Sequence, residues 1–221
     1  MSFVGDDGKI AGFEPDLINE ISKTAGFDYE LVNVEWAGLF GGLITQKYDA
    51  VVASVTILDE RKKRMAFSIP YLRSGLALVV RIDSEKINSV EDLKREQLLI
   101  GAQLGTTSYF YLEKDPAIRK KGYQAYGHAV ADLIKGEIDA VLGESTGTLY
   151  YKNQKKDYFQ KIKMVGEILT EEYYGIVLRK TDPDLLNKID TALKQLLKNG
   201  TVSRLHARWE LGKAAQVPAL D

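Results

Sequence analysis

Three groups of polar residues follow short apolar runs, and each could bind a charged part of a small molecule. The first group is Ser54, Thr56 and Arg61, which come just after the buried strand predicted at residues 49–53. In open α/β sheets, ligands bind beyond the carboxyl ends of the strands. Two hydroxyls and an arginine there can hold a carboxylate through a bidentate ion pair and hydrogen bonds. A surface loop with a helix cap and a solvated arginine is the alternative.

The other two groups complement the first. Thr106 and Thr107 follow Gly105 between a predicted strand and a predicted helix, where backbone N–H groups can bind an anion or form an ordinary N-cap. Glu144 follows the buried strand predicted at residues 138–142 and can either hold an ammonium group or cap the next helix. Together the three groups predict a site for a zwitterion, with the arginine and the N–H groups on its carboxylate and the glutamate on its amine.

Familiar catalytic and metal-binding motifs are missing from the sequence. It has no cysteine and only two histidines, which excludes disulfides, a thiol nucleophile and Cys-ligated or His-rich metal sites. We find no Gly-x-Ser-x-Gly elbow, phosphate-binding loop, dinucleotide fingerprint or His-Glu-x-x-His pair. We therefore expect no catalytic residue, no metal and no cofactor.

The composition is that of an ordinary globular chain. The 221 residues, 45% hydrophobic and 28% charged, suit one large domain or two small ones. A net charge of -1 excludes the broad basic surface expected of a protein whose main partner is nucleic acid or an anionic membrane. No apolar run approaches the length of a membrane span, and the first residues show no signal-peptide pattern.

Hydrophobic periodicity predicts helices and strands in alternation, and hence an α/β fold with largely parallel sheets. Ser89 and Asp92 have the spacing of a capping box at a helix start. The runs at 71–81 and 172–179 are long enough to cross between two lobes of similar architecture. The predicted helices are 15–25, 36–47, 106–113, 129–135, 145–152, 184–198 and 202–210, and the shorter strands are 29–34, 49–53, 98–102, 122–126 and 138–142.

Short motifs occur in a fixed order along nearly the whole chain. They lie at residues 12–17 (Gly-Phe-Glu-Pro-Asp-Leu), 36–39, 48–50, 56–63, 67–71, 105–107, 136–141 and 200–202, with Trp209 after them. This ordered set resembles the amino-acid-binding proteins of bacterial ABC importers, solute-binding protein family 3. The resemblance implies an α/β, two-lobed periplasmic-binding-protein-like (type II) Venus-flytrap fold. Lobe 1 would comprise residues 1–75 and 174–221, and lobe 2 residues 76–173 with the crossing strands.

The resemblance also implies roles for single residues. Arg61 would pair with the α-carboxylate of the ligand, helped by Thr56 and by the backbone N–H of Thr107, with Thr106 beside it in the same motif. Pro15 departs from the aliphatic residue usual in the first motif, although proline is tolerated in the first turn of a helix.

The amine and the side chain of the ligand would meet a second set of residues. Ser54 and Glu144 would bind the α-amine, and Trp36 would stack on the side chain. Glu144 stands where many relatives have aspartate, and its longer arm should alter lobe closure or pocket depth. Glu14 matches an acid that can face a side-chain ammonium, which favours a polar or cationic amino acid.

A further departure lies at the start of the chain. Family members usually open with an apolar strand that is central in the sheet of the first lobe, whereas this sequence begins inside the hairpin that follows it. We therefore expect the first lobe to lack its N-terminal strand. Either Met1 is an internal methionine of a longer product, or another chain's segment or a rearrangement fills the gap.

The resemblance predicts a binding protein and not an enzyme. It would capture a free L-amino acid and deliver it to an ABC transporter permease. It would work in the periplasm or outside the cell, with or without a lipid anchor in the full-length form. A monomer is expected unless another chain supplies the strand. Two alternatives stay open, namely an enzyme on the same scaffold, similar to cyclohexadienyl dehydratase, and the ligand-sensing module of a receptor.

Overall fold

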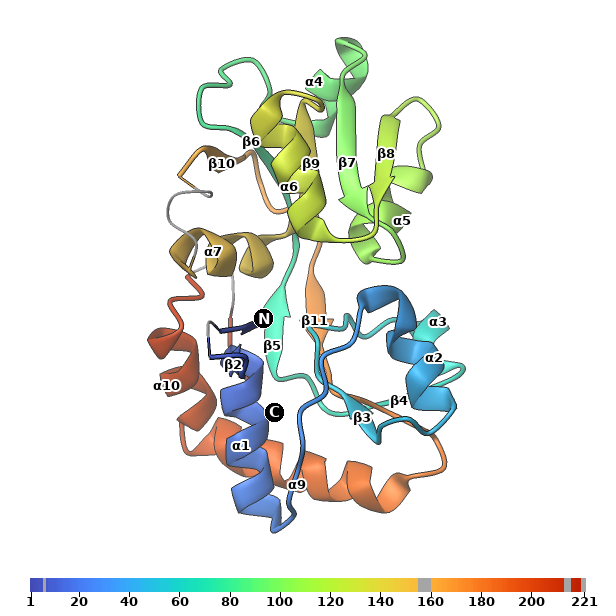
Figure 1. The fold of residues 1–221 in the computed structure, drawn as a ribbon, viewed down its shortest axis with the longest axis vertical. Coiled ribbons are helices and arrows are strands. Elements are labelled where there is room, and N and C mark those ends of the chain that lie inside the picture. The colour runs from blue at the N-terminus through green and yellow to red at the C-terminus, as the bar shows by residue number, and fades with distance from the viewer. Residues whose placement is uncertain (6, 155–159, 213–215, 220–221) are drawn as a thin grey trace. The chain divides into compact units, whose positions relative to one another are not determined.

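The structure is a computed structural model that describes residues 1–5, 7–154, 160–212 and 216–219. The chain forms two compact units, which we call unit 1 (Met1–Arg73 with Glu172–Asp221) and unit 2 (Ser74–Glu171). Each unit combines helices with strands, as Figure 1 shows. Among the described helices, none is both long enough and apolar enough to cross a membrane.

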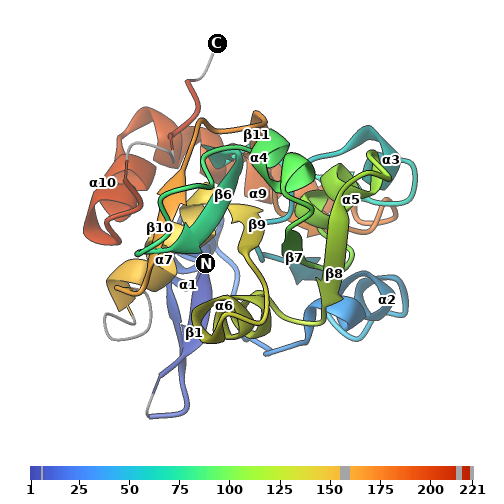
Figure 2. The same ribbon diagram turned by 90° about the horizontal axis from the view of Figure 1, so that it is seen from above.

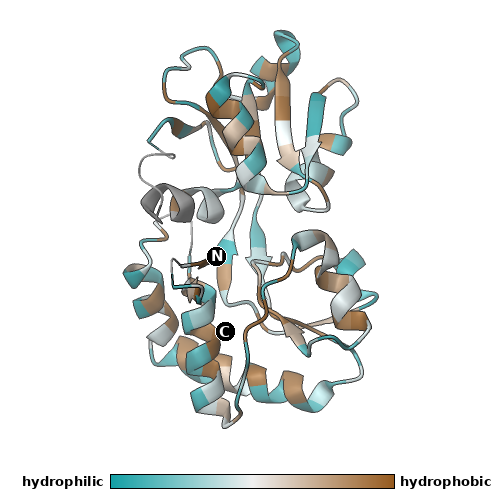
Figure 3. Ribbon diagram, viewed as in Figure 1, coloured by the Kyte–Doolittle hydropathy of each residue, from teal (hydrophilic) through white to brown (hydrophobic). Residues whose placement is uncertain are grey.

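Three amphipathic helices pack together in unit 1. Helix α9 (Pro183–Lys198) contacts both α1 (Phe13–Ala25) and α10 (Thr201–Arg208). Helix α1 buries one apolar stripe and ends at Gly26, whose left-handed φ of 70° suits the residue after a helix. Figure 3 shows the consequence as brown and teal alternating along these helices. The predicted helices at 15–25, 184–198 and 202–210 are thus confirmed, with small shifts of their ends.

The sheet of unit 1 is short and antiparallel. Its strands β3 (Ala50–Val51), β12 (Val177–Leu178) and β4 (Ala66–Phe67) lie in the order β3-β12-β4, and Val177 is opposite both Val51 and Phe67. The expectation of largely parallel sheets is wrong for this unit, because β12 enters from the late part of the chain and runs back between two early strands. The remaining elements are β1 (Ser2–Val4), β2 (Ile10–Gly12), η1 (Trp36–Gly38), α2 (Leu39–Ile44), α3 (Asp59–Lys62) and β11 (Glu172–Tyr174).

Two predicted strands of unit 1 are missing or short. Residues 29–34 form no strand, although their aromatic and β-branched composition favours one. The strand predicted at 49–53 is reduced to Ala50–Val51. Strand formation needs a hydrogen-bonding partner as well as a favourable sequence, and β3 is paired on one edge only within the described residues.

Unit 2 is built on a mixed five-stranded sheet in the order β10-β6-β9-β7-β8. Strand β7 is parallel to both β8 and β9, whereas β6 is antiparallel to β9 and to β10. The sheet is therefore parallel through β9, β7 and β8 and antiparallel through β10, β6 and β9, so the expectation of a largely parallel sheet holds only in part. The strands are β6 (Leu76–Arg81), β7 (Leu99–Gln103), β8 (Arg119–Tyr123), β9 (Ala140–Glu144) and β10 (Ile162–Val165), and β5 (Leu72–Ser74) leads into them.

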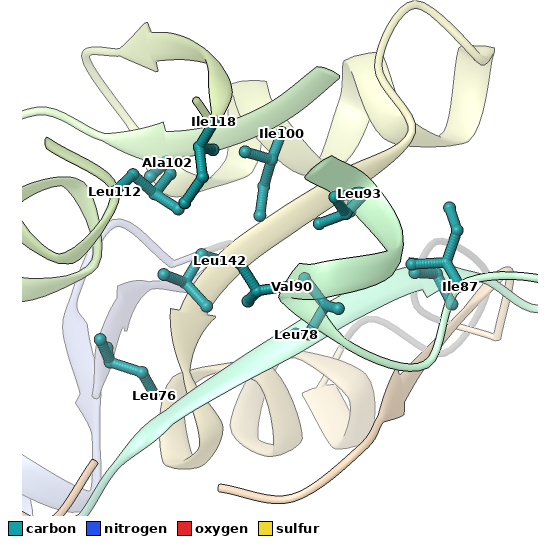
Figure 4. Close-up of a cluster of buried hydrophobic side chains, with 12 residues drawn as sticks. Leu76, Leu78, Ile87, Val90, Leu93, Ile100, Ala102, Leu112, Ile118 and Leu142 are labelled. Atoms are coloured by element: carbon teal, nitrogen blue, oxygen red, sulfur yellow. The ribbon is translucent and has the colours of Figure 1, made fainter. Parts of the chain in front are cut away.

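Helices cover both faces of this sheet. Alternate residues of β6 belong to different cores, since Leu78 and Val80 pack with Leu142 in one cluster and Val79 packs with Val141 in the other. Figure 4 shows the first cluster, to which Val90 and Leu93 of α4 and Leu112 of α5 contribute. In Figure 2, α6 lies on one side of the sheet and α4 and α5 on the other. The helices are α4 (Val90–Arg95), α5 (Thr107–Glu113), α6 (Tyr126–Lys135) and α7 (Ser145–Gln154).

Local signals in unit 2 explain where its elements begin. The Ser89 hydroxyl accepts from the backbone N–H of Asp92 at 3.2 Å, which confirms the predicted N-cap. Strand β8 begins and ends three residues before the predicted strand at 122–126. It lies at the edge of the sheet, and its three basic residues protect this edge from pairing with other chains. This strand is teal in Figure 3, next to the browner β7.

A glycine substitution should test the packing of unit 2. A Cβ at Gly75 would lie 2.0 Å from the backbone oxygen of Thr170, so Gly75→Ala must displace main chain. We expect a loss of about 1–3 kcal/mol in the free energy of unfolding, as is typical of overpacking. The matched control is Gly127→Ala in α6, where a Cβ would meet nothing within 4 Å and should be neutral or stabilising. Equal urea midpoints for the two variants would contradict this reading of Gly75.

Candidate functional site

The guanidinium of Arg61 is the anchor of the first predicted group. Arg61 lies on the short helix α3, is half-buried, and donates from Nη1 to the backbone oxygen of Thr56 at 2.9 Å. Its Cζ lies 6.0 Å from the ring centroid of Trp36 and 5.4 Å from that of Phe40. Cation–π contacts of this kind hold the planar group in one orientation. The structure thus brings together Arg61, Thr56 and Trp36.

The aromatic part of this group follows from helical spacing. Trp36 and Phe40 are four residues apart, and their rings meet edge to face with centroids 6.0 Å apart. The sequence predicts a ligand contact for Trp36 but none for Phe40. Its contact with Arg61 depends on where α3 packs, which no local pattern reveals.

The hydroxyl of Thr56 makes a contact that the sequence did not predict. Thr56 is buried and donates from Oγ1 to Oε2 of Glu172 at 2.8 Å. A β-bridge between Thr56 and Tyr174 fixes the two segments side by side. Glu172 is 116 positions away in the sequence, so no spacing rule could have found it.

Glu14 and Ser54 form a second group in the interior of unit 1. The backbone N–H and the hydroxyl of Ser54 both donate to Oε1 of Glu14, and the hydroxyl of Tyr71 donates to the same oxygen. The α-ammonium of Met1 bonds to Glu14 and donates to the Ser54 hydroxyl at 3.0 Å. Ser54 has a φ of 50°, in the left-handed region that few residues other than glycine adopt. In this strained conformation, both donors of Ser54 point toward the carboxylate of Glu14.

Burial and charge compete at Glu14. Burial alone would raise its pKa, but the Met1 ammonium and the hydrogen bonds from Tyr71 and Ser54 outweigh it and lower the pKa below the usual range. Burial raises the pKa of Tyr71 well above its ordinary value, and the neighbouring Glu14 charge raises it further. Glu14 thus accepts hydrogen bonds from both donors of Ser54 and from the Tyr71 hydroxyl in the interior of unit 1.

In unit 2, the two threonines of the second predicted group lie at the start of α5. Thr106 takes the N-cap position, where its hydroxyl accepts from the N–H of Tyr109 at 3.4 Å and donates to the oxygen of Gln103 at 2.7 Å. The ordinary N-cap is thus formed by Thr106. Thr107 is the first residue of the helix and is half-buried. Its binding role remains a prediction.

Glu144 is the last residue of β9 and directly precedes α7. It is half-buried and lies opposite Leu76 in the ladder with β6. Its backbone oxygen accepts from the Thr148 hydroxyl at 3.0 Å, which ties the strand end to the helix. The carboxylate therefore stands at the carboxyl end of a central strand, where the sequence predicted it.

Metal chemistry has no support in the described part of the chain. Within residues 1–5, 7–154, 160–212 and 216–219, we find no group of three His, Cys, Asp or Glu side chains that could hold a metal ion.

Comparison with known proteins identifies relatives of the chain. The chain is 32% identical over 211 residues to the L-cystine-binding protein TcyJ of Escherichia coli (strain K12), covering 95% of this chain and 77% of that protein. The solved structure of an ancestral arginine-binding protein bound to glutamine superposes with a TM-score of 0.87 at 35% identity, covering 96% of this chain and 92% of that one. The ancestral amino acid-binding protein AncCDT-1, a precursor of cyclohexadienyl dehydratase, matches with a TM-score of 0.85 at 33% identity, covering 94% and 89%.

These similarities confirm the α/β fold class of the two-lobed, type II binding proteins. The curated relatives are named as binding proteins of amino acids, among them an arginine-binding protein of an ABC transporter. The family model for bacterial extracellular solute-binding proteins, family 3, matches residues 1–213. The chain belongs to this family.

Proposed function

We propose that the protein captures a free L-amino acid outside the cytoplasmic membrane and delivers it to the permease of an ABC importer. The observation that carries the proposal is the fixed orientation of the Arg61 guanidinium, which donates to the Thr56 carbonyl and contacts two aromatic rings. A guanidinium in a fixed orientation presents a fork of N–H groups that matches a carboxylate.

In this proposal each unit supplies part of the recognition. Arg61 binds the α-carboxylate, with Thr56 beside it, and Thr107 donates its backbone N–H from the first turn of α5, where Thr106 is the N-cap. Ser54 and Glu144 bind the α-amine. In this proposal the bound ligand favours the conformer that the permease recognises.

The side chain of the ligand is proposed to be polar or cationic. Trp36 offers an aromatic wall, and Glu14 supplies a carboxylate that would face a cationic side chain. The ancestral arginine-binding protein whose solved structure contains glutamine is named for one cationic amino acid and holds one polar amino acid. A thermal-shift screen of the twenty standard L-amino acids tests the proposal. Saturation at 100 times Kd adds about 2.7 kcal/mol, which corresponds to a rise in Tm of roughly 5–10 °C. No shift with any of them would contradict it.

Glu144 offers a test of the amine contact. Replacing it by glutamine keeps the shape but removes the charge that we expect to pair with the α-ammonium. Charge-assisted hydrogen bonds contribute about 1.5–3 kcal/mol, so Glu144→Gln should weaken binding roughly tenfold to a hundredfold in calorimetry. The exposed Glu137, before the same strand, serves as the matched control, since Glu137→Gln should leave the affinity unchanged. Equal effects of the two changes would remove Glu144 from the proposed site.

Enzymatic turnover is the competing function, because AncCDT-1 is a precursor of a dehydratase. Incubation of the purified protein with prephenate or arogenate distinguishes the two. We expect no product, and formation of product would replace the proposal by an enzyme on the same scaffold.

A further inference from the structure

Glu172 is a buried carboxylate that has no part in the ligand contacts proposed above. It lies in β11 of unit 1 and is 6% exposed. Burying a charged side chain is costly unless hydrogen bonds compensate for the lost water. Its Oε2 accepts from the hydroxyl of Thr56 at 2.8 Å, and Thr56 is itself 4% exposed. A residue predicted to lie at the ligand is thus bonded, in the interior, to a carboxylate from a distant part of the chain.

The backbone places these two side chains on one face. Thr56 is opposite Tyr174 in an antiparallel bridge, and Glu172 stands two residues before Tyr174, so the side chains of both β11 residues point to the same face. Diagonal neighbours of this kind are within reach of each other. Main-chain hydrogen bonds of 2.8 and 3.1 Å flank the bridge between residues 55–57 and 173–175. The contact is therefore fixed by the pairing of two main-chain segments.

The direction of the hydrogen bond limits what the Thr56 hydroxyl can do. A hydroxyl has one hydrogen and two lone pairs, and an ionised carboxylate offers no hydrogen in return. Because the hydrogen of Thr56 is directed at Glu172, only lone pairs remain for a third group. The carbonyl oxygen of Thr56 accepts from Nη1 of Arg61 at 2.9 Å, so Thr56 borders the place where Arg61 would bind a carboxylate. The hydroxyl can accept from an N–H beside that carboxylate but cannot donate to the carboxylate.

We infer that Glu172 is a positioning residue that makes the site selective for a protonated α-amine. It fixes the Thr56 hydroxyl as an acceptor. Its negative charge behind the hydroxyl also strengthens a bond from a cationic donor, since successive hydrogen bonds polarise one another. A neutral α-substituent, such as the hydroxyl of a 2-hydroxy acid, gains less from the same acceptor. The inference rests on the proposed function, because it concerns the ligand of the same site.

A purely structural role is the alternative, in which Glu172 only holds β11 against residues 55–57. A change of Glu172 would then weaken the binding of every ligand by the same factor. Glu172→Gln separates the two roles. Glutamine keeps the size and one acceptor, but its amide N–H group can donate to Thr56 and so release the hydrogen of the hydroxyl.

The test is calorimetric titration of the full chain with the L-amino acid that gives the largest thermal shift, and with its 2-hydroxy analogue. For Glu172→Gln we expect the Kd of the amino acid to rise roughly fivefold to tenfold and that of the hydroxy acid about twofold or less, because hydrogen bonds to charged groups contribute more than those between neutral groups. Thr56→Val removes the hydroxyl and should cause the same fall in selectivity, and adding Glu172→Gln to it should cause no further fall. The exposed neighbour Glu171 supplies the matched control, since Glu171→Gln should leave both affinities unchanged.

Equal factors for the amino acid and the hydroxy acid in Glu172→Gln would overturn the inference and leave Glu172 a structural residue. A full additional loss of selectivity in the double variant would also overturn it. If Glu172→Gln fails to fold, Thr56→Val decides instead, since a hydroxyl fixed as an acceptor must show the same fall in selectivity when it is removed. A wild-type protein that binds none of the twenty L-amino acids would overturn the proposed function, and this inference with it.

Discussion

Replacing Arg61 by alanine should weaken binding of the amino acid roughly thirtyfold to several-thousandfold. Truncating one partner of a hydrogen-bonded charge pair costs about 2–5 kcal/mol, and each 1.4 kcal/mol is a factor of ten in Kd. The change leaves the ligand carboxylate without its fork of donors and also frees the Thr56 carbonyl and the rings of Trp36 and Phe40 from their contacts with the guanidinium. Calorimetric titration measures the loss.

Two further variants separate the role of Arg61 from its charge. Arg61→Lys keeps the charge but not the planar fork, so it should bind more weakly than the wild type and more tightly than Arg61→Ala. Arg64→Ala, on an exposed residue just after α3, is the matched control and should leave the affinity unchanged. An Arg61→Ala protein that folds and binds with unchanged affinity would contradict the assignment.

Glu14→Ala should cost about 3–5 kcal/mol in the free energy of unfolding, as is usual when one member of a buried, charged and hydrogen-bonded group is removed. Glu14 is 1% exposed and accepts from Tyr71 and Ser54, which would be left with buried, unsatisfied donors. Urea denaturation measures the effect. Glu20→Ala on the same helix removes only a surface ion pair with Lys23 and should change stability little. Similar losses in both variants would contradict the central role of Glu14.

The same group predicts the acid dependence of stability. The pKa of Glu14 is lower in the folded chain than its ordinary value of 4.5. Its contribution is therefore complete above about pH 4.5 and is lost as the pH falls through the folded-state pKa. Glu14→Gln, which does not titrate, should flatten the loss of stability on the acid side. An unchanged slope would show that other carboxylates govern it.

The sequence alone predicted those features that depend on neighbouring residues. Helix α1 and the cap at Ser89 were predicted because their signals lie within a few positions. Residues 29–34 were wrongly assigned to a strand, because a strand needs a partner that composition does not reveal.

In the candidate site, too, some residues were predicted from the sequence and others were not. The sequence identified Arg61, Thr56 and Trp36, which the structure brings into contact. It missed Glu172, which accepts from Thr56, and Tyr71, which donates to Glu14. Each of these contacts joins segments that only the fold brings together. The binding roles of all eight residues, Arg61, Thr56, Trp36, Glu14, Ser54, Thr106, Thr107 and Glu144, remain predictions that binding measurements on variants can test.

Capture of an L-amino acid is most directly tested by calorimetric titration of the intact protein with the L-amino acid that gives the largest thermal shift. The same titration is then run with its D-enantiomer and with the amine that lacks the α-carboxylate. We predict saturable binding of one L-amino acid per chain and much weaker binding of both analogues. The amine lacks the carboxylate that Arg61 binds, and the D-enantiomer cannot place its carboxylate and its α-amine on their contacts at the same time. Equal binding of the decarboxylated amine, or no heat with any of the twenty L-amino acids, would contradict the account.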